Sequence, residues 1–230
     1  MWLDDAQVAA EVHALRPDYA ALLIVVDGLR PGPSDAASDA VLAAAEDRAR
    51  KHLGDSRPEE LPEVAEWREA FRAFGAKPQR TRPSVEALLR RVDTGLPRID
   101  RITDAYNAVS IARLLPVGGE DLARYAGAAR LVRAAGDEDF DTSADGQPVI
   151  EHPELGEVIW RDDLGVTCRR WNWRQCVRTR ITASTTSAMF VLDGLAALGT
   201  EGLRAAEAEL TGSLARLSPG AAFTSRLLGP

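Results

Sequence analysis

Hydrophobic and polar residues are arranged along the chain in blocks that predict helices around one early strand. Residues 20–29 form a mostly apolar run with β-branched residues at its centre, and an Arg-Pro-Gly-Pro sequence ends it. A run of this length and composition predicts a buried central strand. Residues 4–15 are expected to form a helix before it. A second helix, capped by Ser34 or Asp35 and ended by Gly54, is expected after it.

The middle of the chain shows helical periodicity. Trp67, Phe71 and Phe74 share one helical face, which predicts that these aromatic side chains lie in the core. Residues 84–92 place apolar residues at i, i+3, i+4 and i+7, the pattern of a further amphipathic helix. The stretch Arg101–Asp121 is expected to begin as a helix and to end in a Pro-Val-Gly-Gly turn. The two glycines of that turn would permit close approach of a ligand to the backbone.

The second half of the chain has the alternation and the turn signals of β-structure. Residues 156–161 and 166–173 are expected to pair as a hairpin, and residues 187–192 to form a further apolar strand. A final amphipathic helix is expected over 201–217, with an interruption at Gly212, and the tail after it shows no strong pattern. The order of helices and strands predicts a layered α/β (α+β) domain.

The composition of the 230-residue chain is that of an ordinary globular protein, with 45% hydrophobic and 27% charged residues. This length suits one large domain. No apolar run is long enough to span a bilayer. The N-terminus is acidic and lacks the basic-then-apolar pattern of a secretion signal, so the protein is expected to be cytoplasmic.

The net charge of −7 argues against non-specific coating of nucleic acid, which needs a broad basic face. One local segment is basic, because residues 169–180 interleave five arginines with Trp171 and Trp173. Arginine beside aromatic residues is typical of contacts with bases and phosphates. A solvated strand face along which the arginine stems pack is an equally open interpretation.

Motifs for the common catalytic chemistries are missing from the sequence, which has no P-loop, GxGxxG, GxSxG or HExxH. The three histidines have no cysteine at metal-ligand spacing, so neither a metal nor a cofactor is expected. Cys168 and Cys176 are interpreted as reduced thiols, and a Cys–His pair formed in space stays open. Five carboxylates could supply a base: Glu120, Asp121, Glu157, Asp162 and Asp163.

Several segments, taken in order, resemble one family. They are WREAFRAFG, KPQRTRPSVEALLRRV, ITDAYNAVS, LPVGGEDLARYAG, GEVIWRDDLGVTCRRWNWRQC and ITASTT. Their order and spacing resemble the B3/B4 domain, the editing domain of the phenylalanyl-tRNA synthetase β subunit, which also occurs as a free-standing protein. The resemblance covers roughly residues 65–195. It implies a single domain with a mixed β-sheet flanked by helices, in which residues 1–60 are the N-terminal part and residues 61–230 the B3/B4-like editing domain.

The resemblance can be followed at individual positions. Asp104 and Asn107 align with an aspartate and an asparagine of the synthetase segment. The editing histidine of the synthetase falls at Gly118, so no histidine role carries over to this chain. Thr185 aligns with a threonine of the family's Val-Thr-x-x-Thr pattern.

The family implies hydrolysis of the ester between a wrong amino acid and the terminal ribose of a tRNA, without a covalent nucleophile. On this basis Asn107 is expected to orient the substrate, and the backbone of Gly118 and Gly119 to lie close to the ester. Glu157 or Asp163 is the candidate for holding the amino group or the attacking water. The substrate and the tRNA 3′ end are assigned to a further set: Arg80, Arg82, Arg174, Arg178, Trp171, Trp173 and Thr185.

Three functions stay open from the sequence. They are an editing deacylase of mischarged tRNA, a non-catalytic tRNA- or RNA-binding module, and an RNA-independent enzyme or binder of amino acids or their derivatives. The Arg/Trp segment favours the first two, Gly118 favours the last two, and the acidic charge favours the third. Purely structural roles are the alternative for Asn107, Glu157, the tryptophans and the glycines. The chain has no room for a class II ligase core, so it is not expected to charge tRNA.

Overall fold

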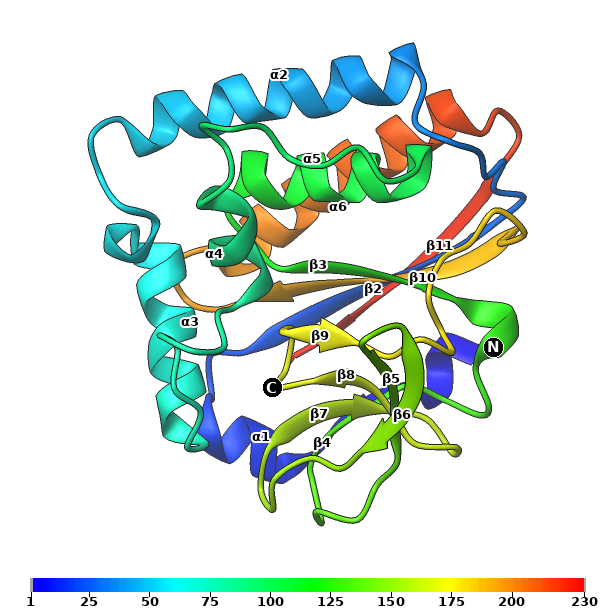
Figure 1. Cartoon of the computed structure of the whole chain (residues 1–230). Helices are drawn as coiled ribbons and strands as arrows, with labels where there is room; N and C mark the ends of the chain where they lie inside the picture. The colour runs from blue at the N-terminus through cyan, green and yellow to red at the C-terminus, as the bar shows by residue number, and fades with distance from the viewer. Residues whose placement is uncertain (1, 230) are drawn as a thin grey trace.

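The chain folds into two stacked β-sheets with helices along the outside (Figure 1). The computed structural model describes residues 2–229. The helices are α1 (Ala10–Leu15), α2 (Ala36–Leu53), α3 (Pro62–Ala73), α4 (Ser84–Leu89), α5 (Arg101–Arg113) and α6 (Gly199–Leu217), with 3-10 helices η1 (Trp2–Asp5), η2 (Pro58–Glu60) and η3 (Leu122–Arg124). The strands are β1 (Gln7–Val8), β2 (Ala20–Asp27), β3 (Val117–Asp121), β4 (Arg130–Arg133), β5 (Phe140–Ala144), β6 (Gln147–Glu151), β7 (Val158–Arg161), β8 (Val166–Arg169), β9 (Arg174–Gln175), β10 (Ser187–Gly194) and β11 (Ala222–Leu228).

The upper sheet is antiparallel, with the strand order β11-β2-β10-β3. β2 lies inside this sheet, and Leu22, Leu23 and Ile24 are fully buried, which confirms the predicted central strand. Helices α5 and α6 cover one face of the sheet, and α2 packs on the outer side of α5 (Figure 1). No helix in residues 2–229 combines the length and the apolar character needed to cross a membrane.

The lower sheet is mixed, with the strand order β1-β4-β7-β8-β9. β1 pairs with β4 in parallel, and every other pair in this sheet is antiparallel. The predicted hairpin of residues 156–173 is present as β7 and β8. β5 and β6 form a separate hairpin in front of the sheet (Figure 1). The predicted α/β class is therefore confirmed, with two sheets and a hairpin instead of one sheet.

Aromatic side chains join the two sheets in a shared core. Trp171, in the loop between β8 and β9, packs edge-on against Tyr19 and Trp67, with ring centroids 4.9 Å and 5.4 Å away. Trp67 and Phe71 are buried, and the half-buried Phe74 lies 6.3 Å from Trp171. The predicted core role of this aromatic face of α3 is confirmed.

Helix ends follow the local signals in the sequence. The Asp35 side chain accepts hydrogen bonds from the backbone of Ala37 and Ser38 and completes a capping box at the start of α2. Gly54 ends α2 with a positive φ of 53°. Both predictions are confirmed, because a cap depends on a few neighbouring residues and needs no distant partner.

Three expectations about elements are wrong, and one strand, in the tail, was not expected. Residues 117–121 form strand β3 instead of a turn, because they pair with β10 along its whole length. α6 continues through Gly212, because burial of Leu210 and Leu214 offsets the roughly 1 kcal/mol by which glycine destabilises a helix. The tail forms β11, which pairs with β2. Residues 4–15 divide between η1, β1 and α1 because β1 pairs with β4.

Candidate functional site

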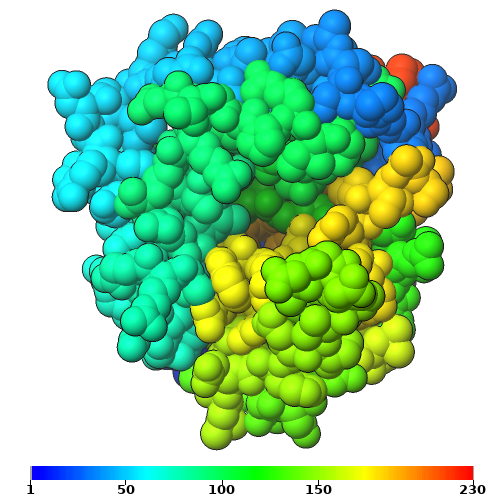
Figure 2. Space-filling model, in the orientation of Figure 1, coloured from blue at the N-terminus to red at the C-terminus, as the bar shows by residue number. Residues whose placement is uncertain are grey.

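A cavity of about 280 Å³ opens between the two sheets, beside α4 and α5. Its wall is built by α4, α5, β3, β10 and the β7–β9 part of the lower sheet. Figure 2 shows its opening as a hollow near the centre of this face, between the green α5 region and the yellow β9 region. Ligand pockets commonly measure roughly 300–1,000 Å³, so this volume suits a small ligand of about amino-acid size.

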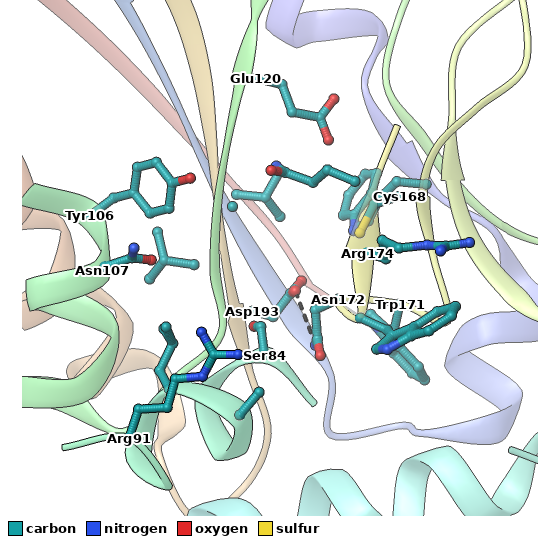
Figure 3. A pocket seen from close by; sticks show the side chains of 18 residues that line it. Ser84, Arg91, Tyr106, Asn107, Glu120, Cys168, Trp171, Asn172, Arg174 and Asp193 are labelled. Carbon is teal, nitrogen blue, oxygen red and sulfur yellow. Dashed lines mark hydrogen bonds between the residues drawn. The ribbon is translucent and has the colours of Figure 1, made fainter. Parts of the chain in front are cut away.

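Asn107 reaches the cavity from α5 (Figure 3). Asp100 caps this helix by accepting hydrogen bonds from the backbone of its first turn. Asp104, one turn further, is fully buried and accepts a hydrogen bond from Ser38 of α2 at 3.1 Å. These contacts hold the helix that carries Asn107. Its amide is 8% exposed and makes no hydrogen bond to residues 2–229, so its donor and acceptor groups are open to a ligand.

The two glycines of β3 play different parts. Gly118 lines the cavity, and a Cβ there would lie 3.0 Å from Nε2 of Gln175. The amide of Gln175 therefore occupies the room into which a side chain at position 118 would extend. Gly119 sits in packed surroundings, where a Cβ would lie 2.8 Å from Ile181 and 2.9 Å from Phe190. Close packing within the sheet accounts for the absence of a side chain at Gly119.

The two glycines also differ in the direction in which their backbone N–H groups point. The carbonyl of Gly119 accepts a hydrogen bond from Gln175 Nε2 at 3.1 Å, on the edge of β3 away from β10. The N–H and C=O of one residue in an antiparallel strand point to the same side, so the N–H of Gly119 lies on this outer edge as well. The N–H of Gly118 points the other way, toward β10. The outer edge of β3 thus presents a backbone donor beside Gln175.

Glu120 lines the cavity from β3, directly after the glycines (Figure 3). It is 2% exposed, and the Tyr125 hydroxyl donates a hydrogen bond to its Oε2. Burial raises the pKa of Glu120 to about 7, and hydrogen bonds from Tyr125, Thr179 and Thr167 offset part of that effect. A carboxyl with a pKa near neutral pH can exchange a proton with bound water or ligand.

Asp193 is the second buried carboxyl of the cavity, and it comes from β10. Its Oδ1 accepts a hydrogen bond from the Tyr19 hydroxyl at 2.6 Å, and its Oδ2 accepts one from Asn172 Nδ2 at 3.3 Å. Burial raises the pKa of Asp193 to about 7, partly offset by these two hydrogen bonds. Glu120 and Asp193 therefore give the cavity two carboxyls that titrate near neutral pH.

Several residues that line the cavity carry polar atoms without a hydrogen-bond partner. Five such atoms are buried and make no hydrogen bond within residues 2–229: Ser84 Oγ, Trp160 Nε1, Trp171 Nε1, Asn172 Oδ1 and Arg174 Nε. Buried polar groups in folded proteins are nearly always hydrogen-bonded. Three N–H donors, one amide oxygen and one hydroxyl around the cavity are thus left without a partner inside the protein.

The two tryptophans assigned to base stacking are not open surfaces. Trp171 is fully buried in the aromatic core, and one part of it lines the cavity. Trp171 and Arg170 both have positive φ, 67° and 48°, a conformation that non-glycine residues rarely adopt. Trp173 is half-buried, and guanidinium groups lie over its ring, with Arg170 at 4.6 Å and Arg174 at 4.7 Å from its centroid.

Most arginines assigned to the tRNA are paired inside the protein. Arg174 pairs with Glu151 at 2.6 Å, and Arg178 binds Asp162 through both terminal nitrogens. Arg82 lies 3.5 Å from the buried Glu86. Arg80 is exposed, makes no ion pair within the described part of the chain, and lines a second cavity of about 440 Å³.

Three other predicted residues lie outside the main cavity. Glu157 is buried and binds Arg169 through both carboxylate oxygens, at 2.9 Å and 2.8 Å. Asp163 is exposed and pairs with Arg130 at 2.7 Å. Thr185 is buried and donates to Asp121 at 2.8 Å, which holds the turn before β10. The structure therefore brings together Asn107, Gly118, Trp171, Trp173 and Arg174 around one cavity, and places these three residues elsewhere.

The cysteines and histidines do not form a catalytic pair in the cavity. Cys168 lines it, but burial raises the pKa of this thiol well above its usual range. Burial likewise raises the pKa of Cys176 to about 11, so both thiols stay protonated at neutral pH. No histidine of residues 2–229 lines the cavity. Among the same residues, no group of three or more His, Cys, Asp or Glu is placed to hold a metal ion.

Sequence reasoning missed the two titrating carboxyls. Glu120 was one of five possible bases with nothing to single it out, and Asp193 follows an apolar strand pattern with no motif around it. The signal for Asp193 is weak but present, because a carboxylate at the end of a buried strand is itself unusual.

These features define a layered α/β domain with a small polar cavity on one face. The sequence model of the B3/4 domain matches residues 66–202, more than half of the chain, and the chain therefore belongs to the B3/4 domain family. A solved N-terminal fragment of the phenylalanyl-tRNA synthetase beta-subunit from Pyrococcus horikoshii is similar to it, with a TM-score of 0.49 and 12% identity. The match covers 95% of this chain and 49% of that one, so the chain spans about half the length of the fragment. Comparison with curated proteins finds no match.

Proposed function

We propose that this domain hydrolyses the ester bond of an aminoacyl-tRNA. The observation that carries the proposal is one small cavity shared by the free amide of Asn107 and the carboxyl of Glu120, beside the outer edge of β3. Ester hydrolysis needs a base for the water, donors for the oxyanion and a group that orients the substrate. Glu120 and Asn107 in the cavity are the candidates for the base and the orienting group, and the Gly119 N–H on the outer edge of β3 is the candidate donor. All three lie within the region that matches the B3/4 family.

The proposed reaction needs no covalent nucleophile. Glu120 takes a proton from a water molecule, whose oxygen forms a bond to the ester carbon. The Gly119 N–H donates a hydrogen bond to the oxyanion while the Asn107 amide holds the substrate. The bond between the carbon and the ribose oxygen then breaks, and Glu120 returns the proton to that oxygen. A pKa of about 7 suits Glu120 for both transfers.

Contacts with the tRNA are proposed for cations near the cavity that have no partner inside the protein. Arg91 lines the main cavity and is exposed, and Arg80 and Lys77 line the second cavity. None of the three forms an ion pair within the described residues. Free cations of this kind can bind phosphates, whereas Arg174 and Arg178 would first have to leave Glu151 and Asp162.

An RNA-independent enzyme or binder of amino acids is the second candidate function. The observation in its favour is the pairing of Arg169, Arg170, Arg174 and Arg178 with carboxylates, on a chain of net charge −7. These ion pairs leave few free cations for a nucleic acid. The same cavity would then hold an amino-acid ligand without a tRNA.

The test is a panel of radiolabelled aminoacyl-tRNAs incubated with the whole chain. We expect the protein to accelerate release of at least one amino acid, and Asn107→Ala and Glu120→Gln each to slow that release by about a hundredfold or more. Asp163→Asn is the matched control, because it removes an exposed carboxylate away from the cavity and should keep the wild-type rate.

Other results would decide against hydrolysis. Salt-sensitive retention of tRNA without any deacylation would identify a binding module instead. Neither deacylation nor retention, together with a higher melting temperature in the presence of a free amino acid, would favour the RNA-independent function. Full activity in Glu120→Gln would remove Glu120 from the proposed reaction.

A further inference from the structure

Asp193 is a buried carboxyl that forms no ion pair with a cation of the described residues. Its two hydrogen bonds come from neutral donors, the Tyr19 hydroxyl and the Asn172 amide. No Lys, Arg or His of residues 2–229 lies within ion-pair distance of it, although its side chain is 3% exposed. Buried carboxylates are normally paired with a cation, because burial of a lone charge is costly. The ionised form of Asp193 therefore lacks a cationic partner in the protein, and a positively charged group of a ligand would supply one.

The hydrogen-bonding capacity around Asp193 matches an ammonium group. Each carboxylate oxygen can accept two hydrogen bonds, and each of those of Asp193 accepts one from the protein. Asn172 turns its Nδ2 toward Asp193, which leaves its Oδ1 buried and without a partner in the same cavity. Figure 3 shows the two side chains joined on the lower part of the wall, away from Glu120 at the top. An ammonium group has three N–H donors for these acceptors.

The surroundings of Asp193 strengthen such a contact. Trp160 and Trp171 line the same cavity and are almost fully buried, so water has little access to this part of the wall. A charge–charge contact is stronger where water is excluded. The nitrogen of an N-acylated amino acid, by contrast, carries no charge and one N–H donor, and its acyl group would need additional room.

We propose that Asp193, with Asn172, is the anchor for the free ammonium group of the ligand, so that the cavity accepts an unblocked amino-acid moiety and rejects an N-acylated one. This inference rests on the proposed function for the class of ligand. It adds a selection that hydrolysis alone does not require: the site acts on aminoacyl groups and spares N-blocked aminoacyl or peptidyl groups. Asp193 is here a substrate-binding residue, and Glu120 remains the base.

Protonation restricts this contact to a narrow pH window. Asp193 is ionised above its pKa of about 7, and the ammonium of an amino-acid amide is lost above roughly pH 8. Binding should therefore be strongest near pH 7.5. Tyr19 and Cys168 face Asp193 and stay protonated there, because burial raises the pKa of both. Glu120 titrates in the same cavity, and Arg91 and Arg174 line it with constant charge.

The experiment measures binding of small probes to the whole chain. The amides of the twenty amino acids are compared with their N-acetyl counterparts by thermal unfolding and calorimetry at pH 7.5. We expect at least one free amide to bind and its N-acetyl form to bind at least tenfold more weakly. Asp193→Asn keeps the shape of the side chain and the Tyr19 contact. This variant should bind the free amide at least tenfold more weakly, and its affinity should change little between pH 6 and 7.5. In Glu120→Gln, binding of the free amide should still depend on pH between 6 and 7.5, because Asp193 still titrates there.

Several outcomes would overturn the anchor. They are equal binding of free and N-acetyl amides, unchanged affinity in a folded Asp193→Asn variant, or no binding by any amide. The comparison of free and acetylated probes uses the wild-type chain, so it holds even if the variant fails to fold. Probe binding without tRNA deacylation would support Asp193 as the ammonium-binding residue and contradict the proposed hydrolysis of aminoacyl-tRNA. Equal deacylation of free and N-acetylated aminoacyl-tRNA would keep the hydrolase and reject the anchor.

Discussion

At the scale of single residues, burial sets the chemistry of the cavity. Glu120 and Asp193 have no charged partner, so desolvation raises the pKa of each to about 7. Asp162 is fully buried as well, but its pKa is lowered, because hydrogen bonds from Arg178 and the backbone outweigh the desolvation. The same side-chain type therefore serves as a fixed structural anion in one place and as a titrating group in another.

Tyr125 offers a test of this balance for Glu120. The hydrogen bond from the Tyr125 hydroxyl stabilises the ionised carboxylate and lowers its pKa. Tyr125→Phe removes that bond, so the pKa of Glu120 should rise by about one unit. The proposed base acts in its ionised form, and the rise of the deacylation rate with pH should move to higher pH by the same amount. An unchanged pH–rate profile in this variant would show that Glu120 is not the titrating base.

At the scale of elements, β3 determines the shape of the site. The strand presents Gly118 to the cavity, buries Gly119 against Ile181 and Phe190, and then presents Glu120. Gln175 from β9 fills the space beside Gly118 and bonds to the Gly119 carbonyl. The space into which a side chain at position 118 would extend is thus occupied by an amide from the neighbouring sheet.

The two glycines should respond differently to the addition of one methyl group. Gly119→Ala places a Cβ within 2.9 Å of both Ile181 and Phe190, so the free energy of unfolding should fall by about 1–3 kcal/mol. The Cβ of Gly118→Ala lies 3.0 Å from the flexible end of Gln175, so this substitution should lower the free energy of unfolding by less than about 1 kcal/mol. Urea denaturation of the two variants measures the difference. Equal losses would show that the packing around Gly119 is loose.

Elements that depend on neighbouring residues could be predicted from the sequence, and those that depend on distant pairing could not. The apolar run of β2 and the cap at Asp35 are local signals. β11 is an edge strand whose residues are mostly half-exposed or exposed, so it carries little alternation. β3 begins with Val-Gly-Gly, which reads as a turn until β10 pairs with it. The site follows the same division: Asn107 could be aligned with a family motif, whereas Asp193 owes its raised pKa to burial among segments distant in the sequence, such as that of Tyr19, 174 residues away.

At the scale of the whole molecule, arginines and carboxylates neutralise each other over most of the surface near the site. Arg169 joins Glu157 to Glu151, and Arg174 binds Glu151 as well, so the β5–β6 hairpin is tied to β8 and β9. Four of the five arginines in a segment that resembles a basic patch in the sequence are therefore ion-paired in the fold. Partner binding through charge has to rely on the remaining free cations.

The two raised pKa values also predict how stability depends on pH. Between about pH 4.5 and 7 the folded chain keeps protons on Glu120 and Asp193 that the unfolded chain has lost. The unfolding free energy therefore falls as pH rises through this window, by on the order of 3 kcal/mol for each group. The groups with lowered pKa, such as Asp162, act in the opposite direction below this window.

Thermal unfolding between pH 5 and 8 checks this prediction. We expect the melting temperature of the wild type to fall across the range. The double variant Glu120→Gln, Asp193→Asn should have a much flatter profile, because neither substituted side chain titrates. A melting temperature that rises with pH in the wild type would contradict the raised pKa values of Glu120 and Asp193.

The tryptophans of the chain give the cavity an optical property. Three of the five, Trp160, Trp171 and Trp173, line it, whereas Trp67 lies behind Trp171 and Trp2 contacts Tyr125. Indole emission responds to the polarity and the charges around the ring. A ligand that enters the cavity changes those surroundings for three fluorophores at once. Occupancy can therefore be followed by the intrinsic fluorescence of the unlabelled protein.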